Sequence, residues 1–225
     1  LASAIGKCIL ILSRRVALNV GLFLGDILYL TLRKERNKAI KNLFYAFGTE
    51  KSADEIYKIC RRCFRNLGKG LIEFFQFPKL KPDNFRNFVS VEGKQNVDEV
   101  LKKGKGGIVI TAHFGNWELV GASFSLLGYH STAIVRPAKL QKLDEFVNRY
   151  RQKTGLKCIG RGASIKGAIQ CLRRNEILGI LADVDTKVDG VFVDFFGHPA
   201  YTPKGPVSLA LKTGAGILPA FMIRQ

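Results

Sequence analysis

Residues 107–118 read Gly-Ile-Val-Ile-Thr-Ala-His-Phe-Gly-Asn-Trp-Glu, and this stretch decides the fold. A short run of apolar, mostly β-branched residues after glycine predicts a buried strand over residues 108–112. Gly115 permits a tight turn, and a helix is predicted to begin at Asn116 or Trp117. A strand that passes through a short turn into a helix is the repeating unit of an α/β fold.

The same alternation of strands and helices continues from about residue 88 to the end of the chain. We predict strands at residues 89–91, 108–112, 131–135, 157–159, 177–182, 191–195 and 217–223. We predict helices at residues 96–103, 117–127, 140–154, 164–174 and 206–213. This order predicts an α/β fold with a mostly parallel sheet flanked by helices. The last strand reaches the end of the chain, so we expect further C-terminal elements in the natural protein.

Residues 1–78 carry a helical pattern instead. Ser52 followed by Glu55 predicts a capping box, and apolar residues then recur near the helical period up to Phe75. Pro78 is a helix-ending signal. We therefore divide the chain into a helical, membrane-associated region at residues 1–78 and an α/β catalytic core at residues 79–225.

The charge balance points to an anionic partner. The chain of 225 residues has 36 Lys and Arg against 18 Asp and Glu, a formal net charge of +18. Nucleic acid, anionic lipid and phosphorylated or acidic substrates all fit that excess. Nucleic acid is disfavoured, because the aromatic residues are mainly Phe at apolar positions and no nucleic-acid-binding signature is present. We expect no nucleic-acid partner.

The N-terminal segments suggest contact with anionic membrane lipids. Residues 2–12 and 16–32 are largely apolar, but Arg14 and Arg15 separate them, and neither reaches the roughly 20 apolar residues of a spanning helix. A cationic cluster at residues 33–38 follows, which is typical of a segment held at an anionic cytoplasmic leaflet. The alternatives are a spanning helix, a helix lying on the bilayer, and an ordinary helical hairpin packed on the domain.

The five Cys residues do not form a disulfide framework. Cys60 and Cys63 form a Cys-x-x-Cys pair at apolar positions of the helical pattern. No second pair is present to complete a zinc site. We interpret these thiols as reduced and buried.

His113 and Glu118 are the candidate catalytic pair. His113 follows a strand at the carboxyl edge of the sheet, where α/β proteins gather their functional groups. Glu118 falls in the first turn of the next helix, where its carboxylate could hold one ring nitrogen of His113. The other nitrogen could then take a proton from a hydroxyl. No nucleophilic Ser or Cys motif accompanies the pair, so direct attack by a substrate hydroxyl on an activated acyl group is favoured over a covalent intermediate.

The segment from His113 to Glu118 resembles the His-x-x-x-x-Asp/Glu box of the glycerolipid-type acyltransferases. Its form is similar to that of the lipid A biosynthesis (lauroyl/myristoyl) acyltransferases. Further blocks resemble that family in the same order along the chain. They are Phe-Arg-Asn-Leu-Gly at residues 64–68, Arg-Pro at 136–137, Gly-Val-Phe-Val-Asp-Phe-Phe-Gly at 190–197 and Pro-Ala-Tyr-Thr-Pro-Lys-Gly-Pro at 199–206.

The resemblance implies roles for individual residues. His113 would be the general base and Glu118 its orienting partner. Asn116 and Trp117 would shape the substrate site. Arg136 would stabilise the acyl oxyanion or hold a donor phosphate, for which its permanent charge and several donors are suited.

Two departures from the family pattern concern polar positions. Val135 replaces the usual Tyr before the Arg-Pro pair, and Ala-Asp-Val-Asp at residues 182–185 replaces Pro-Asp-Gln-Asp. Asp183 and Asp185 are kept, and we expect them to fix loops or arginines near the substrate. Paired carboxylates can bind Mg²⁺, but the resemblance implies no metal and no other cofactor. Arg161 is a candidate contact for a substrate phosphate.

The implied activity is transfer of a fatty acyl group from an acyl carrier protein thioester, or from acyl-CoA, to a hydroxyl of a glycolipid. The expected acceptor is a lipid A precursor, with a phosphatidylinositol mannoside or a lysophospholipid as alternatives. The expected location is the cytoplasmic face of the bacterial inner membrane. A non-catalytic membrane scaffold that keeps the fold is disfavoured by the intact His113 and Glu118 pair.

Overall fold

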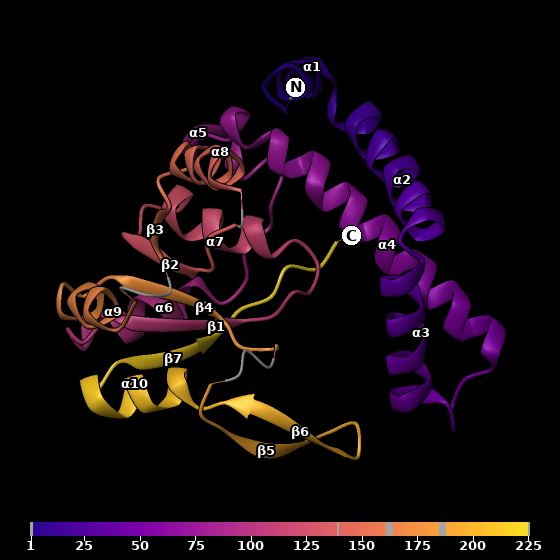
Figure 1. The fold of residues 1–225 in the computed structure, drawn as a ribbon. Helices are drawn as coiled ribbons and strands as arrows, with labels where there is room; N and C mark the ends of the chain where they lie inside the picture. Colours follow the sequence, from indigo (N-terminus) through magenta and orange to yellow (C-terminus); the bar gives the residue numbers. More distant parts are fainter. Residues whose placement is uncertain (1, 139, 161–163, 185–187, 225) are drawn as a thin grey trace. The chain divides into compact units, whose positions relative to one another are not determined.

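The structure is a computed structural model that describes residues 2–138, 140–160, 164–184 and 188–224. Contacts divide the chain into two compact units, whose elements are labelled in Figure 1. The helical unit contains residues 1–76 together with 193–200, and the α/β unit contains residues 77–192 and 201–225. Residues 193–200 thus group with the helices by their contacts, whereas the predicted division places them in the α/β core.

The helical unit is built from four helices. They are α1 (Ala2–Ile11), α2 (Arg14–Thr31), α3 (Arg33–Phe47) and α4 (Ala53–Phe75). The predicted capping box is present at the start of α4, where Ser52 and Glu55 bond to each other's main-chain N–H groups. Within the described residues no single helix is long and apolar enough to cross a bilayer. Together α2 and α3 meet that test, but they join at a 91° bend.

Helices α2 and α4 pack with their backbones in close contact. The contact face of α2 consists of the buried residues Ala17, Gly21 and Gly25. Gly68 of α4 lies opposite, and a Cβ atom built on it would be only 2.2 Å from the carbonyl oxygen of Gly21. The absence of side chains at these glycines allows the two helices to approach this closely. Asp26 then reaches two arginines of α4, with its carboxylate 2.8 Å from both Arg61 Nε and Arg65 Nη2.

The α/β unit contains a five-stranded parallel sheet in the order β3-β2-β4-β1-β7 (Figure 1). Its strands are β1 (Gly107–Thr111), β2 (Ser131–Val135), β3 (Lys157–Gly160), β4 (Ile177–Leu181) and β7 (Gly216–Pro219). The helical elements are η1 (Phe77–Lys79), α5 (Pro82–Phe85), α6 (Lys94–Lys102), α7 (Trp117–Leu126), α8 (Gln141–Gln152), α9 (Ser164–Arg173) and α10 (Gly205–Thr213). Strands β5 (Gly190–Phe195) and β6 (His198–Pro203) form a separate two-stranded sheet. The predicted fold class is confirmed.

Alternate residues of the central strands face opposite sides of the sheet. Ile108 and Leu178 pack with residues of α9 and α10 on one face. Val109 and Ile177 pack with residues of α6 and α7 on the other. Because both faces are covered, these strands are apolar along nearly their whole length, with Thr111 at the end of β1 as the polar residue.

Two predicted strands differ from the structure, and one observed strand was not predicted. Residues 89–91 form no strand, because the chain there is still leaving α5, with the N–H of Val89 bonded to the carbonyl of Phe85. Strand β6 was not predicted, since its prolines obscure the alternating pattern. The last strand ends at Pro219 rather than Ile223, and residues 220–224 run on without regular structure.

Candidate functional site

The carboxyl edge of the parallel sheet assembles the candidate site. Strands β1 and β4 are neighbours, and their register pairs Thr111 with Leu181. His113 and Asp183 each follow two residues after that pair, so the topology brings them level at the edge. They are 70 positions apart in the sequence.

Asp183 binds His113 through both carboxylate oxygens. One oxygen accepts the main-chain N–H of His113 at 2.8 Å, and the other lies 3.0 Å from the ring nitrogen Nδ1. The imidazole is about half exposed, and Trp117 meets it edge-on with ring centroids 5.0 Å apart. Among the described residues no group hydrogen-bonds the second nitrogen, Nε2. Nε2 is therefore available for a hydrogen bond with another molecule.

Glu118 does not occupy the place expected from its spacing. Its carboxylate forms a two-pronged ion pair with Arg151 of α8, at 2.9 Å from Nε and 2.6 Å from Nη2. Both side chains are largely buried. The first turn of α7 directs Glu118 toward α8, and the hydrogen bond to Nδ1 of His113 comes from Asp183 instead. Burial alone would lower the pKa of Arg151, but the bonds to Glu118 outweigh it and raise that pKa.

The turn between β1 and α7 is tightly constrained. Gly115 has a φ of +60°, and a Cβ atom there would lie 1.8 Å from the carbonyl oxygen of Met222. Asn116 is buried and caps α7, since its side-chain oxygen accepts the N–H of Leu119 at 3.1 Å. Asn116 thus shapes the loop that carries His113, and the first N–H groups of α7 begin directly beside it.

Of the other predicted site residues, the structure describes Arg136 but not Arg161 or Asp185. Arg136 follows β2 at the same carboxyl edge, is exposed, and has no ion-pair or hydrogen-bond partner in the described part of the chain. Arg161 and Asp185 lie outside the described residues. Sequence reasoning missed Arg151 as the partner of Glu118, because no local pattern links the end of α8 to the start of α7.

A narrow, mainly apolar cavity of about 50 Å³ lies between α7 and the sheet. Thr111 at the end of β1 lines it, and its buried hydroxyl has no hydrogen-bond partner among the described residues. Trp117, Glu118 and Arg151 also line this cavity. Its volume is comparable with about two water molecules, so it is too small for a fatty acyl chain in this arrangement.

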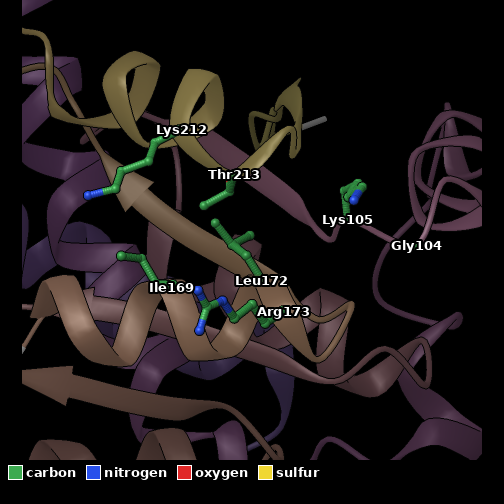
Figure 2. Close-up of a pocket in the computed structure, with 7 residues that line it drawn as sticks. All are labelled: Gly104, Lys105, Ile169, Leu172, Arg173, Lys212 and Thr213. Atoms are coloured by element: carbon green, nitrogen blue, oxygen red, sulfur yellow. The ribbon is translucent and has the colours of Figure 1, made fainter.

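A larger depression of about 300 Å³ lies near the start of β1, at the opposite end of that strand from His113 (Figure 2). It is bordered by Lys105, Arg173 and Lys212. Arg173 and Lys212 belong to the last turns of α9 and α10, where cations interact favourably with the carbonyl ends of helices. Their positions are accounted for by helix stabilisation, and none of the predicted site residues lines this depression.

Comparison with known proteins places the sequence in a family. The chain is 27% identical to a phosphatidylinositol mannoside acyltransferase of Mycobacterium tuberculosis, over 80% of the chain and 58% of that protein. It is 28% identical to a lipid A biosynthesis palmitoleoyltransferase of Escherichia coli, over 86% of the chain and 63% of that protein. The chain thus spans about three fifths of the length of these relatives. Residues 1–225 match the family described as bacterial lipid A biosynthesis acyltransferase, and the chain belongs to that family.

Proposed function

We propose that this chain is the catalytic part of a membrane-associated O-acyltransferase that acts on a glycolipid. The observation that carries the proposal is the open Nε2 of His113, beside the first turn of α7, in a chain of this family. The donor is an acyl carrier protein thioester, with acyl-CoA as the alternative. The acceptor is a hydroxyl of a lipid A precursor, with a phosphatidylinositol mannoside or a lysophospholipid as alternatives.

In the proposed reaction, Nε2 of His113 takes the proton of the acceptor hydroxyl while its oxygen attacks the thioester carbon. The carbonyl oxygen becomes negative in the tetrahedral intermediate. N–H groups at the start of α7 and the side chain of Arg136 are the proposed stabilisers of that charge. The carbon–sulfur bond then breaks, the ester is formed, and the imidazolium returns the proton to the leaving thiolate. A thioester is already activated, so no covalent enzyme intermediate is needed.

The proposed location is the cytoplasmic face of the inner membrane, and helix α2 supports it. Its exposed face carries an apolar stripe at helical spacing. The stripe consists of Val16, Val20, Phe23, Ile27 and Leu30. Cations lie at both ends of α2, at residues 14–15 and 33–34. An apolar helical face flanked by cations is typical of a helix in the plane of an anionic bilayer.

Flotation with lipid vesicles tests this attachment. The protein should bind vesicles that contain anionic lipid, and high salt should weaken the binding. A variant with Phe23→Ser and Leu30→Ser should lose most of it, because those are the two most exposed residues of the stripe, at 69% and 64%. Leu211→Ser is the matched control, since Leu211 is an exposed leucine of the α/β unit. Equal binding by all three proteins would exclude α2 as the membrane surface.

Acyl transfer in detergent tests the activity. Carrier-protein and CoA thioesters would be offered with each of the three acceptor classes, and products would be identified by mass. We expect one acceptor to gain an acyl group, and His113→Ala to lose a factor of about 10²–10⁴ in rate. A wild-type rate in that variant would remove His113 from the mechanism. If none of the acceptors gained an acyl group, the acyltransferase assignment would be wrong.

A further inference from the structure

Strands β5 and β6, labelled in Figure 1, form a two-stranded hairpin whose apolar side chains are exposed. Every residue from Val191 to Phe195 is exposed, so both faces of this ribbon are uncovered. The block at residues 190–197 resembles the family, yet the proposed reaction gives it no role. Contiguous exposed apolar side chains mark a surface that contacts another molecule.

The turn of the hairpin places a phenylalanine where the backbone disfavours it. Phe196 and Gly197 form the two-residue loop between the strands, with φ of +55° and +72°. Such loops normally carry Asn-Gly or Asp-Gly, because a large side chain is strained at a positive φ. Phe196 is about half exposed, so burial in the protein does not explain why it occupies this position. Strain of this kind persists where the residue serves a function.

Aromatic contacts join the hairpin turn to helix α3 within the helical unit. Phe196 meets Phe47 edge-on with ring centroids 4.9 Å apart, and His198 stacks on Tyr45 at 3.8 Å. These contacts still leave Phe195 64% and Tyr45 65% exposed. The exposed residues of this cluster, which we name the aromatic tip, are Tyr45, Val193, Phe195 and Phe196.

Cations border the aromatic tip. The Nζ atom of Lys51 lies 5.9 Å from the centre of the Phe47 ring. Lys38 and Lys41 are exposed and lie on the same face of α3 as Tyr45, because helical spacing brings the three positions into line. The helical unit as a whole has 14 Lys and Arg against 7 Asp and Glu, a net charge of +7. Exposed aromatic rings bordered by cations fit the boundary between the acyl chains and the headgroups of an anionic bilayer.

The shape of the hairpin also fits fluid lipid. A partner that docks by its surface covers one face of a ribbon, whereas acyl chains can surround both faces. A two-stranded sheet has two outer edges, and their N–H and C=O groups are costly to bury in hydrocarbon, so the insertion must be shallow. We propose that the aromatic tip inserts at the surface of an anionic bilayer, as an attachment point of the helical unit in addition to α2. This inference deepens the proposed function and rests on its membrane attachment.

Tryptophan quenching measures the insertion directly. The chain has a single Trp, so Phe195→Trp in a Trp117→Phe background gives one reporter at the aromatic tip. The protein would be floated with vesicles of equal parts phosphatidylglycerol and phosphatidylethanolamine, with or without bromine on the acyl chains. Leu211→Trp in the same background is the matched control, because Leu211 is an exposed leucine of α10 in the α/β unit. We expect brominated chains to quench the reporter at residue 195 and to leave the one at residue 211 bright.

The substitution Phe196→Asn separates membrane binding from folding. Asn suits a turn position with a positive φ, so relief of strain should offset the lost contact with Phe47 and keep the melting temperature near that of the wild type. The same change removes a half-exposed apolar side chain from the lipid and should weaken vesicle binding about tenfold. Leu211→Asn is the matched control and should bind like the wild type.

The outcomes separate the aromatic tip from the membrane attachment as a whole. Vesicle-bound protein whose reporter at residue 195 is not quenched would overturn the proposal and leave the attachment through α2 in place. Equal quenching of both reporters would also overturn it, as would wild-type vesicle binding by Phe196→Asn. Absence of the wild type from the floated fraction would reject the membrane attachment, and the proposal with it. The quenching needs no turnover and no asparagine variant, so it decides the matter even if Phe196→Asn does not fold.

Discussion

Replacing Gly68 by alanine should separate helices α2 and α4. The new Cβ atom would lie 2.2 Å from Gly21 O and 2.6 Å from Gly25 N. Comfortable contact between carbon atoms is about 3.5–4.0 Å, so the helices must move apart by roughly 1 Å. Both clashing atoms belong to the backbone, and no side-chain rotation can relieve them.

The cost follows from this geometry. Overpacking of a close interface costs about 1–3 kcal/mol, and a backbone clash lies at the upper end of that range. Alanine recovers about 1 kcal/mol because it is the better helix former. The net loss is therefore about 2 kcal/mol, which corresponds to a roughly 30-fold larger equilibrium constant for opening of the helix pair.

Hydrogen exchange measured by mass spectrometry would follow the amides of α2 and α4. Gly25→Ala should show the same effect, since its Cβ atom would lie 2.4 Å from Arg65 Cα. Gly205→Ala is the control, because Gly205 begins helix α10 with no atom within 4 Å of the new methyl group. Exchange of α2 in Gly68→Ala at the wild-type rate would refute the close-packing argument.

Three other perturbations test single contacts. Arg151→Met leaves the carboxylate of Glu118 buried and unpaired, and it should lower the free energy of unfolding in urea by about 3 kcal/mol. Adding Glu118→Gln should recover part of that loss. Equal stability of Arg151→Met and the double variant would contradict a buried ion pair. The hydrogen bonds from two arginines lower the pKa of Asp26. Its contribution to stability is therefore complete above the unfolded-state pKa of about 3.9 and is lost as the pH falls further. Asp26→Asn should flatten the acid side of a plot of melting temperature against pH, and an unchanged plot would argue against the pairing. Burial raises the pKa of Cys171 to about 11, so maleimide should label this thiol only after unfolding, as peptide mapping would show.

Local signals in the sequence predicted most of the α/β unit. Strand β2 matches its predicted bounds, residues 131–135, because glycine and polar residues border a short apolar run. The capping box of α4 was also predictable, since its two partners are three residues apart. Strand β6 could not be found this way. Pro199 and Pro203 lie within it and interrupt the alternation of apolar and polar residues that indicates a strand. The strand is instead defined by its pairing with β5.

The candidate site was predictable only in part. The position of His113 at the end of a strand follows from the strand–turn–helix pattern, and the structure has it there. The partner of that histidine depends on which strand lies beside β1. Besides residues 108–112, six further strands were predicted, and no local signal in the sequence selects residues 177–182 as the neighbour. Asp183 was therefore expected near the site, but its contact with His113 was not.

The electrostatics of the site also favour Asp183 over Glu118 as the partner of an imidazolium. The charge of Glu118 is compensated at 2.6 Å by Arg151, so a positive charge on His113 gains little from it. The charge of Asp183 is compensated by no arginine or lysine among the described residues, and it lies 3.0 Å from the ring. Neutralising Glu118 should therefore disturb the packing of α7 against α8, whereas neutralising Asp183 should weaken its contacts with the main chain and ring of His113. The two carboxylates carry the same charge, but Asp183 contacts His113 and Glu118 contacts Arg151.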